Sequence, residues 1–487
     1  MNATFVGFVA EPSGRGTLSL LYSCLGVLLI CVWGALHLNL PKPNEGNGKR
    51  TRRYLFWTMM ALLCPELLLW ISWRKLNSAR ELTRIISKSA ASGSGQPRQH
   101  SWTILHSFYA GMGGFAIDLA SHKLGILETG YLGDSSQLVL TPHGVELLAQ
   151  SGHLPDMDKK EIEEKNRADI LAKTICCLQV GWMVLQSVER YRLQLPLSLL
   201  EVYTLAHVLC ALALYALWWH KPKMITEPTC IRCDGDLGRI VAFMFMASQL
   251  SAPDRPAATI MKKLAKPELA VIGLRSPTAR DMEPGGHRDR EARAQELRRK
   301  LASEAVSRFP FLAHYYAGGE SDINTFTSNR WTAVQKDLVT DHASNWPDHG
   351  LLRAPGDGLI SVFVWLASVM YGAVHLLAWL TRFAFPSDVE RWAWGASAAY
   401  LIFSGVLWAV LVYLDRIFAG CLWSWDGLLH GTSGKTARYS LIPLMALGGT
   451  LSAAARLFLL GESLASLRAT PPQVYACPQW AASIPHM

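Results

Sequence analysis

The residues best suited to chemistry are acids, histidines and an arginine that stand inside apolar segments. Glu66 follows Cys64 and Pro65 near the middle of one such segment, residues 54–73. A carboxylate at the centre of a bilayer costs about 2.5 to 3.5 kcal/mol on insertion scales, and desolvation favours its neutral form. The proline removes one helical hydrogen bond and permits a kink. We interpret Glu66 either as a buried general acid or as a polar tie between two helices.

Three more polar residues share a regular spacing. Glu201, Thr204 and His207 stand three residues apart within residues 195–219. On a helix this spacing places them on one stripe about 120° wide, but Glu201 and His207 are too far offset to contact each other. Each would therefore meet a group on another helix. The stripe predicts an acid and a base lining a cavity in the membrane, or polar contacts between helices worth about 0.6 kcal/mol each.

Two further polar residues lie inside later apolar segments. One is His375, with Tyr371 one helical turn earlier, and the other is Arg456. A buried arginine requires a counter-charge, so we expect Arg456 to pair with Glu66 or with Glu201. The acid that pairs with it would be ionised and would no longer be a general acid.

These side chains can meet only if the segments that carry them form helices that pack together. Of the 487 residues, 50% are hydrophobic and 17% are charged, whereas soluble domains carry about 25% charged residues. Stretches of about 20 apolar residues are long enough to span a bilayer. Such stretches are residues 17–38, 54–73, 195–219, 359–380, 392–414 and 440–460. Weaker candidates are residues 103–120, which are rich in glycine, 170–188 and 237–250. The expected fold is an all-α, polytopic integral membrane helical bundle with about seven spans.

Long polar stretches between the spans divide the chain into regions. We expect a pair of transmembrane helices over residues 1–73, a polar segment with re-entrant or additional helices over 74–194, a transmembrane helix plus a short apolar segment over 195–250, an extramembrane loop region over 251–355, and C-terminal transmembrane helices with a tail over 356–487. Residues 288–305 are rich in charge and predict a solvated surface helix within the loop region, with contact to a membrane surface as the alternative.

The charge and the aromatic residues favour a lipid environment. The formal net charge of +9 suits anionic lipid surfaces, and we expect no nucleic-acid partner. The 18 tryptophans fit belts in which indoles lie between headgroups and hydrocarbon, and Trp218, Trp219 and Lys221 predict an anchor of this kind. We expect the lipid bilayer and a lipophilic small molecule as partners. The expected location is the endoplasmic reticulum or another endomembrane rather than the plasma membrane.

The sequence lacks the motifs of several common enzyme classes. It has no G-x-x-x-x-G-K-[ST], no H-E-x-x-H and no G-x-S-x-G, and no aspartate motif of the kind that holds magnesium on a diphosphate. We expect no cofactor and no metal. Cys230 and Cys233 form an isolated C-x-x-C. Without a second pair it predicts plain loop thiols, with a metal site or a disulfide as the alternative.

Some stretches of the chain carry a resemblance. They are residues 106–115 (HSFYAGMGGF), 195–208 (LPLSLLEVYTLAHV), 218–222 (WWHKP), 462–468 (ESLASLR) and 480–486. Together they resemble a large group of polytopic membrane proteins of filamentous fungi, most of them without an assigned function. The likeness covers most of the chain except residues 251 to about 309. It implies a polytopic membrane fold near secondary-metabolite pathways. Some small fungal membrane proteins there are similar to metal-free terpene cyclases, which protonate an epoxide or alkene with a buried acid; the link to this chain is an analogy.

Our leading hypothesis is a membrane protein of fungal secondary metabolism that acts on a lipophilic intermediate, by metal-free acid–base cyclisation or isomerisation if it is an enzyme. Glu66 would be the acid, and Glu201 and His207 the base or the groups that stabilise a cation, assisted by Trp and Tyr faces. His375 and Arg456 are additional polar candidates. The alternatives are a transporter or exporter of a small lipophilic metabolite, with Arg456 and Glu66 as a gate pair, and a non-catalytic scaffold or receptor.

Overall fold

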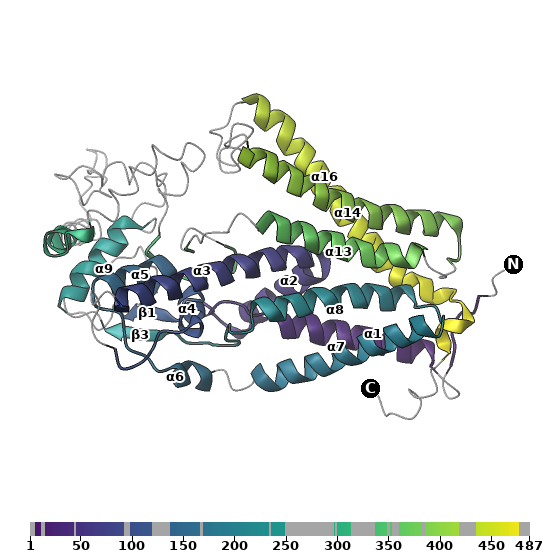
Figure 1. The fold of residues 1–487 in the computed structure, drawn as a ribbon, viewed down its shortest axis with the longest axis horizontal. Coiled ribbons are helices and arrows are strands. Elements are labelled where there is room, and N and C mark those ends of the chain that lie inside the picture. The colour runs from purple at the N-terminus through teal and green to yellow at the C-terminus, as the bar shows by residue number, and fades with distance from the viewer. Residues whose placement is uncertain are drawn as a thin grey trace.

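The computed structural model is mostly helical and has two parts that meet along one long helix. It describes residues 5–10, 15–42, 45–91, 98–118, 137–165, 169–232, 235–248, 297, 300–312, 337–347, 351–352, 360–380, 385–417 and 435–476. Long helices lie side by side in a bundle, and shorter helices gather with a small sheet at one end of it (Figure 1). The predicted helical character of the chain is confirmed, and the sheet is a departure from it.

Every segment predicted to span a membrane contains helix. The bundle consists of α1 (Thr17–Ala35), α2 (Asn47–Leu63), α3 (Pro65–Ala91), α7 (Asp169–Arg192), α8 (Leu199–Leu217), α13 (Ile360–Leu380), α14 (Asp388–Ile417) and α16 (Lys435–Ala465). Within the described residues, α1 and α8 are long and apolar enough to cross a membrane, and the bent pair of α2 and α3 adds a third if it is one span. The segment Leu366–Leu380 of α13 is apolar but shorter. The structure therefore does not show seven spans.

The span predicted over residues 54–73 is broken into two helices. α2 ends at Leu63 and α3 begins at Pro65, and the two helices are bent by 111° relative to each other. A proline at the first position of a helix lacks an N–H that would be unpaired there in any case. The helix α3 can therefore begin at Pro65 without losing a backbone hydrogen bond. The predicted kink is thus a change of direction between two helices. It places Glu66 in the first turn of α3, where the helix dipole favours a carboxylate.

The sheet belongs to the smaller part of the molecule, which we call the α+β lobe. Its elements are α4 (Ile104–Gly111), β1 (Phe115–Asp118), β2 (Gln137–Leu140), α5 (Pro142–Gln150), α6 (Lys159–Glu164), β3 (Thr229–Arg232), α9 (Asp236–Ala247) and β4 (Val339–Thr340). The strand order is β3-β1-β2-β4; β1 is antiparallel to β2 and parallel to β3, and β2 is antiparallel to β4. The all-α expectation is wrong here because strands this short leave no clear period-two pattern in the sequence.

Two of the weaker apolar segments form this lobe and not the bundle. Residues 103–118 form α4, a turn with Gly113 at a φ of +84°, and β1. The glycines therefore end a helix and turn the chain into a strand, and they do not make a re-entrant helix. Residues 236–247 form α9, whose Met244 and Phe245 are fully buried in the lobe core. Its apolar residues pack in a protein core. A helix this short is more often part of a core than a membrane span.

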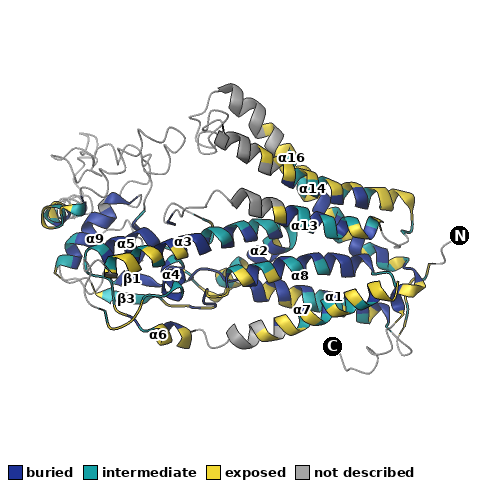
Figure 2. Ribbon diagram, viewed as in Figure 1, coloured by how far each residue is buried: buried dark blue, intermediate teal, exposed yellow. Residues whose placement is uncertain are grey.

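The helix α3 connects two hydrophobic cores. Leu68 and Leu76 belong to the bundle core, and Leu82 and Ile86, further along the same helix, belong to the lobe core. The domain boundary expected after residue 73 thus falls inside α3. Within the bundle α8 is the more enclosed of the two span candidates, with 72% of its apolar window buried against 39% for α1. Exposed residues run along α7, α14 and α16 (Figure 2).

Part of the predicted loop region lies outside the described residues. The charged helix expected over 288–305 is described at residue 297 and from residue 300 on, and residues 300–308 are helical. Arg308 pairs with Asp236 of α9 at 2.8 Å. Ala302 and Ala305 lie in the lobe core. This segment therefore packs on the lobe, and its charged side faces solvent.

The chain after β4 carries a carboxylate that makes stability depend on pH. His342 Nδ1 donates to Asp341 Oδ1 at 2.7 Å, and Lys42 Nζ lies 3.6 Å from Oδ2. The hydrogen bond from His342, followed by the charge of His342 and then that of Lys42, outweighs burial and lowers the pKa of Asp341 from 3.8 to about 2. A carboxylate with a depressed folded pKa stabilises the fold fully above its unfolded pKa and loses that effect as the pH falls through the folded one.

We therefore expect Asp341→Asn to lower the thermal unfolding midpoint relative to the unchanged protein above about pH 4, with the difference shrinking to nothing towards about pH 2. Parallel unfolding curves over this pH range provide the measurement. A difference between the two proteins that is constant across the range would contradict the assignment.

Candidate functional site in the bundle

The structure brings four of the five predicted site residues together. Glu66 on α3, His207 on α8, His375 on α13 and Arg456 on α16 gather around the ring of Tyr371. Arg456 pairs with Glu66, and its Cζ lies 5.2 Å from the centre of the Tyr371 ring. The rings of His207 and His375 lie 5.2 and 4.6 Å from that ring. We call these five residues, together with Tyr203 one turn before His207, the polar cluster. Its members are Glu66, Tyr203, His207, Tyr371, His375 and Arg456.

The same Tyr-x-x-x-His spacing occurs on two neighbouring helices. Tyr203 precedes His207 on α8, and Tyr371 precedes His375 on α13, so each pair lies on one helix face. In each pair Nδ1 of the histidine donates to the tyrosine carbonyl, at 3.0 Å on α8 and 2.8 Å on α13. The pairs also meet, because the rings of Tyr203 and His375 lie 5.7 Å apart. Sequence reasoning missed Tyr203, although this spacing in two apolar segments was a signal that could have found it.

The two histidines differ at their other ring nitrogen. His207 Nε2 lies 2.9 Å from the carbonyl oxygen of Leu62, and the Tyr203 hydroxyl donates to the same oxygen at 3.3 Å. This carbonyl is at the C-terminal end of α2, where helical partners are missing. Because carbonyl oxygens only accept, His207 can donate to both of its contacts only as an imidazolium.

His375 presents an open nitrogen instead. With Nδ1 donating to its own helix, the neutral ring has Nε2 as an acceptor. Within the described part of the chain, this nitrogen is buried and has no hydrogen-bond partner. The ring is held in place by Trp394, whose Nε1 donates to the His375 carbonyl at 2.9 Å and whose ring centre lies 5.5 Å from the imidazole. His375 is therefore a positioned base without a proton donor.

Arg456 pairs with Glu66 and leaves Glu201 to another partner. The side chains of Arg456 and Glu66 are 3% and 15% exposed. Glu66 is thus one partner of a buried ion pair and not the isolated acid that its position in an apolar segment suggested. Glu66 Oε2 and Arg456 Nη1 are both buried without a partner among the described residues. Since buried polar atoms are nearly always paired, the ion pair has an acceptor and a donor to offer a further group.

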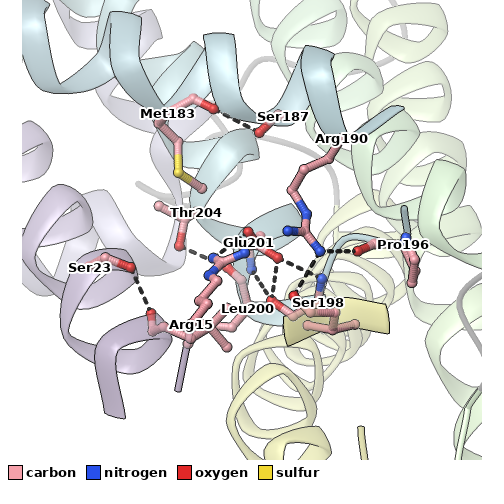
Figure 3. A network of polar contacts seen from close by, with 12 residues as sticks. Arg15, Ser23, Met183, Ser187, Arg190, Pro196, Ser198, Leu200, Glu201 and Thr204 are labelled. Atoms are coloured by element: carbon pink, nitrogen blue, oxygen red, sulfur yellow. Dashed lines mark hydrogen bonds and ion pairs between the residues drawn. The ribbon is translucent and has the colours of Figure 1, made fainter. Parts of the chain in front are cut away.

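Glu201 lies outside the polar cluster, in a network at the start of α8 (Figure 3). Its carboxylate accepts from the N–H and hydroxyl of Ser198 at 2.8 and 2.9 Å, which is the capping box of α8, and from Arg15 Nη2 at 2.5 Å. Thr204 donates to the backbone of its own helix. The stripe of Glu201, Thr204 and His207 is buried throughout, but only His207 reaches the cluster. The structure gives Glu201 a helix-capping role, and its part in catalysis stays a prediction.

The C-x-x-C motif of Cys230 and Cys233 does not belong to the polar cluster. Cys230 is on β3 and not in a loop, and Gln137 Nε2 donates to its sulfur at 3.2 Å. Cys233 lies outside the described residues. In the part of the chain that the structure describes, no three His, Cys, Asp or Glu side chains are grouped so as to hold a metal ion.

A helical bundle with a buried polar cluster and an attached α+β lobe is the class of protein that these observations define. The chain belongs to a family of unknown function, DUF8562, which it matches over residues 1–283 and 286–487. It matches no curated protein and no solved structure. The likeness to fungal membrane proteins of secondary metabolism therefore stays a prediction.

Proposed function

We propose that this protein is a polytopic integral membrane protein whose polar cluster catalyses proton transfer from and to a lipophilic small molecule. The observation that carries the proposal is the buried, unpartnered Nε2 of His375. Leaving such an atom unsatisfied costs about 1 to 3 kcal/mol. It lies beside an ion pair, Glu66 with Arg456, that has its own unpartnered acceptor and donor. A ligand with a hydroxyl, carbonyl or epoxide oxygen would satisfy these groups together.

The apolar exterior of the bundle supports placement in a membrane. Large apolar side chains are exposed on its outer helices, namely Leu29 and Trp33 on α1, Leu178 and Leu185 on α7, and Phe403 on α14. Exposed apolar surface of this kind marks contact with lipid or with another protein. With two or three helices that meet the criterion for a span, we propose that the remaining long bundle helices complete about seven spans in an endomembrane of a fungal cell.

Each member of the cluster has a role in the proposed reaction. His375 Nε2 accepts a proton from one atom of the substrate and returns it to another, while His207 holds α8 against the end of α2. Arg456 Nη1 donates to the substrate oxygen, and the face of Tyr371 stabilises positive charge that develops nearby. One proton is removed and one is added, so the product is an isomer of the substrate and no co-substrate is consumed. This is the balance of an isomerisation or a cyclisation.

Untargeted mass spectrometry of cells that lack this gene tests the proposal. We expect the deletion to accumulate an isomer of the lost product. Complementation with His375→Gln should yield at least about 100-fold less product than the unchanged gene, because a general acid or base contributes at least that factor. The protein should remain in the membrane fraction at an unchanged level. The control is His220→Gln, the same change at an exposed histidine just after α8, which should restore the product. Full restoration by His375→Gln would remove His375 from the mechanism.

Transport of a lipophilic metabolite is the second candidate, and the break between α2 and α3 favours it. Discontinuous helices often bind the cargo of transporters at their exposed ends, and Glu66 lies in the first turn after the break. If this function holds, deletion leaves an unchanged product inside the cell, and vesicles containing the purified protein take up that product without altering it. If deletion leaves the metabolite profile unaltered, the protein is neither the enzyme nor the transporter, and the function that remains is that of a scaffold or receptor.

A further inference from the structure

The helix α2 begins near the α+β lobe and ends inside the bundle. Near its start, Arg53 Nη1 donates to the carbonyl of Leu40 at 3.3 Å, and Leu40 packs in the lobe core. At its end, the carbonyl oxygen of Leu62 lies 2.9 Å from Nε2 of His207, which stands halfway along α8. The next helix, α3, then runs back to the lobe core, where Leu82 is buried. The two helices thus form a V that enters the bundle from the lobe side and returns to it.

The ends of α1 and α8 lie at the level from which this V enters the bundle. Lys221, just after α8, donates to the carbonyl of His37, just after α1. Lys221 is 1% exposed, so the prediction that it is an interfacial anchor is wrong. Trp33 and Trp219, at the ends of the same two helices, are 40% and 58% exposed, and Trp33 stacks on Tyr54 of α2 with ring centres 5.3 Å apart. Exposed tryptophans at one level are typical of the boundary between headgroups and hydrocarbon.

The first turns of α2 carry an excess of positive charge. Arg53 pairs with Glu45 at 3.4 Å, but Lys49, Arg50 and Arg52 form no ion pair within the described ranges of the chain. Lys49 and Arg52 are exposed. The first turn contains no acidic residue, and no side chain caps the helix. The positive end of the helix dipole therefore adds to these charges, and the start of α2 is complementary to an anionic group.

Beyond the basic turns, the exposed side of α2 is apolar. Leu55, Phe56 and Met59 are 54%, 50% and 51% exposed. Their spacings of three and four residues continue the helix stripe that contains Arg52. The stripe is thus basic at the level of the exposed tryptophans and apolar further into the bundle. A phospholipid presents its phosphate and then its acyl chains in the same order, whereas a soluble anion matches only the basic end.

We propose that this stripe of α2 binds an anionic phospholipid, with the phosphate on Lys49, Arg50 and Arg52 and the acyl chains along the apolar residues. The inference rests on the proposed placement of the bundle in a membrane. Anionic phospholipids give the cytoplasmic leaflet its negative surface potential, and basic residues beside spans favour the cytoplasmic side. The α+β lobe therefore faces the cytoplasm. The lipid neutralises the start of the V, and the turn of the V places Glu66 in the polar cluster.

Thermal unfolding of the purified full-length protein in a nonionic detergent tests this site. The probe is dioctanoyl phosphatidylserine, compared with dioctanoyl phosphatidylcholine and with glycerol phosphate, which has no acyl chains. We expect phosphatidylserine to raise the unfolding midpoint by at least about 2 °C, in a saturable way, because a ligand that binds only the folded state stabilises it by mass action. Phosphatidylcholine should raise the midpoint less at the same concentration, and glycerol phosphate should not change it.

Two matched double variants assign the lipid effect to α2. Lys49→Gln with Arg52→Gln should increase the phosphatidylserine concentration at half-maximal shift by about 25-fold, since each basic residue near an anionic surface contributes roughly a factor of five. Lys159→Gln with Lys160→Gln, at two exposed lysines of α6, should leave that concentration unchanged.

Three results would overturn the proposal while leaving the proposed function in place. They are equal responses of the unchanged protein to the two lipids, an unaltered phosphatidylserine titration in the α2 double variant, and an effect of glycerol phosphate as large as that of the lipid. The first would assign the basic turns to another partner, such as an acidic protein, and the last to a free phosphate. A purified protein that stays monodisperse in buffer without detergent would instead overturn the membrane placement, and the lipid site with it.

Discussion

Arg456→Met should lower the free energy of unfolding by about 3 to 5 kcal/mol, the usual cost of removing one partner of a buried ion pair. The substitution removes a guanidinium that is 3% exposed and leaves the carboxyl group of Glu66 without its partner in the bundle interior. The dipole of α3 at Glu66 is a minor compensation, worth about 0.3 to 1 kcal/mol at an exposed helix end. The amount of protein that survives heating in detergent as a monodisperse species measures the effect.

Two further variants separate the ion pair from other causes of instability. The double variant Glu66→Gln with Arg456→Met should recover most of the loss, because no charge is left unpaired. Arg468→Met is the matched surface control: Arg468 pairs with Glu390 but its side chain is 55% exposed, and exposed pairs contribute about 0 to 1 kcal/mol. If Arg456→Met is as stable as Arg468→Met, the Glu66–Arg456 pair does not stabilise the bundle.

Arg190→Met should be the second strongly destabilising change, with a loss of at least about 3 kcal/mol. Arg190 is 2% exposed and donates to the carbonyls of Pro196, Gln473, Val474 and Ala476. These carbonyls belong to the loop before α8 and to the segment around the 3₁₀ helix Pro472–Tyr475. Hydrogen bonds to a charged donor are worth about 1.5 to 3 kcal/mol each, and carbonyls left buried without a donor add a penalty.

The rate at which trypsin cleaves the C-terminal segment measures whether the Arg190 contacts hold it in place. Without them, we expect residues 469–476 to separate from α7, so that trypsin cleaves after Arg468 faster than in the unchanged protein. Arg192→Met is the control, because Arg192 lies two residues further along α7 and its side chain is 75% exposed; its effect should stay within about 0.5 kcal/mol. Equal cleavage rates in the Arg190 and Arg192 variants would show that Arg190 does not hold this segment.

Most of the polar cluster was predictable because an ionisable side chain is conspicuous in an apolar segment. Glu66, His207, His375 and Arg456 were each found in this way, and the cost of burying them predicted that they would have partners. Tyr203 was not found, since tyrosine is common in apolar helices and attracts attention only through its spacing from His207. The choice of Glu66 as the partner of Arg456 was not predictable, because both acids lie in helices of unknown packing.

The α+β lobe could not be predicted from the sequence for a related reason. Its strands are four residues long or shorter, and β1 pairs with β3 from more than a hundred residues further along the chain. A short apolar run is equally consistent with a strand, a buried helix and part of a span. Lys221 shows the same limit, since a lysine after two tryptophans fits an anchor at the membrane surface as well as it fits a buried charge.

Composition and hydropathy by themselves determined that this chain is mostly helical and which residues carry unusual polar groups, because both properties depend on neighbours within a few turns. Only the tertiary structure decided that the second predicted span is two helices, that Glu201 caps a helix while Glu66 joins the cluster, and that Lys221 is buried. Each of these depends on contacts between residues that are far apart in the sequence. Pairing energies of this kind arise where helices pack, and no local pattern records which helices will be neighbours.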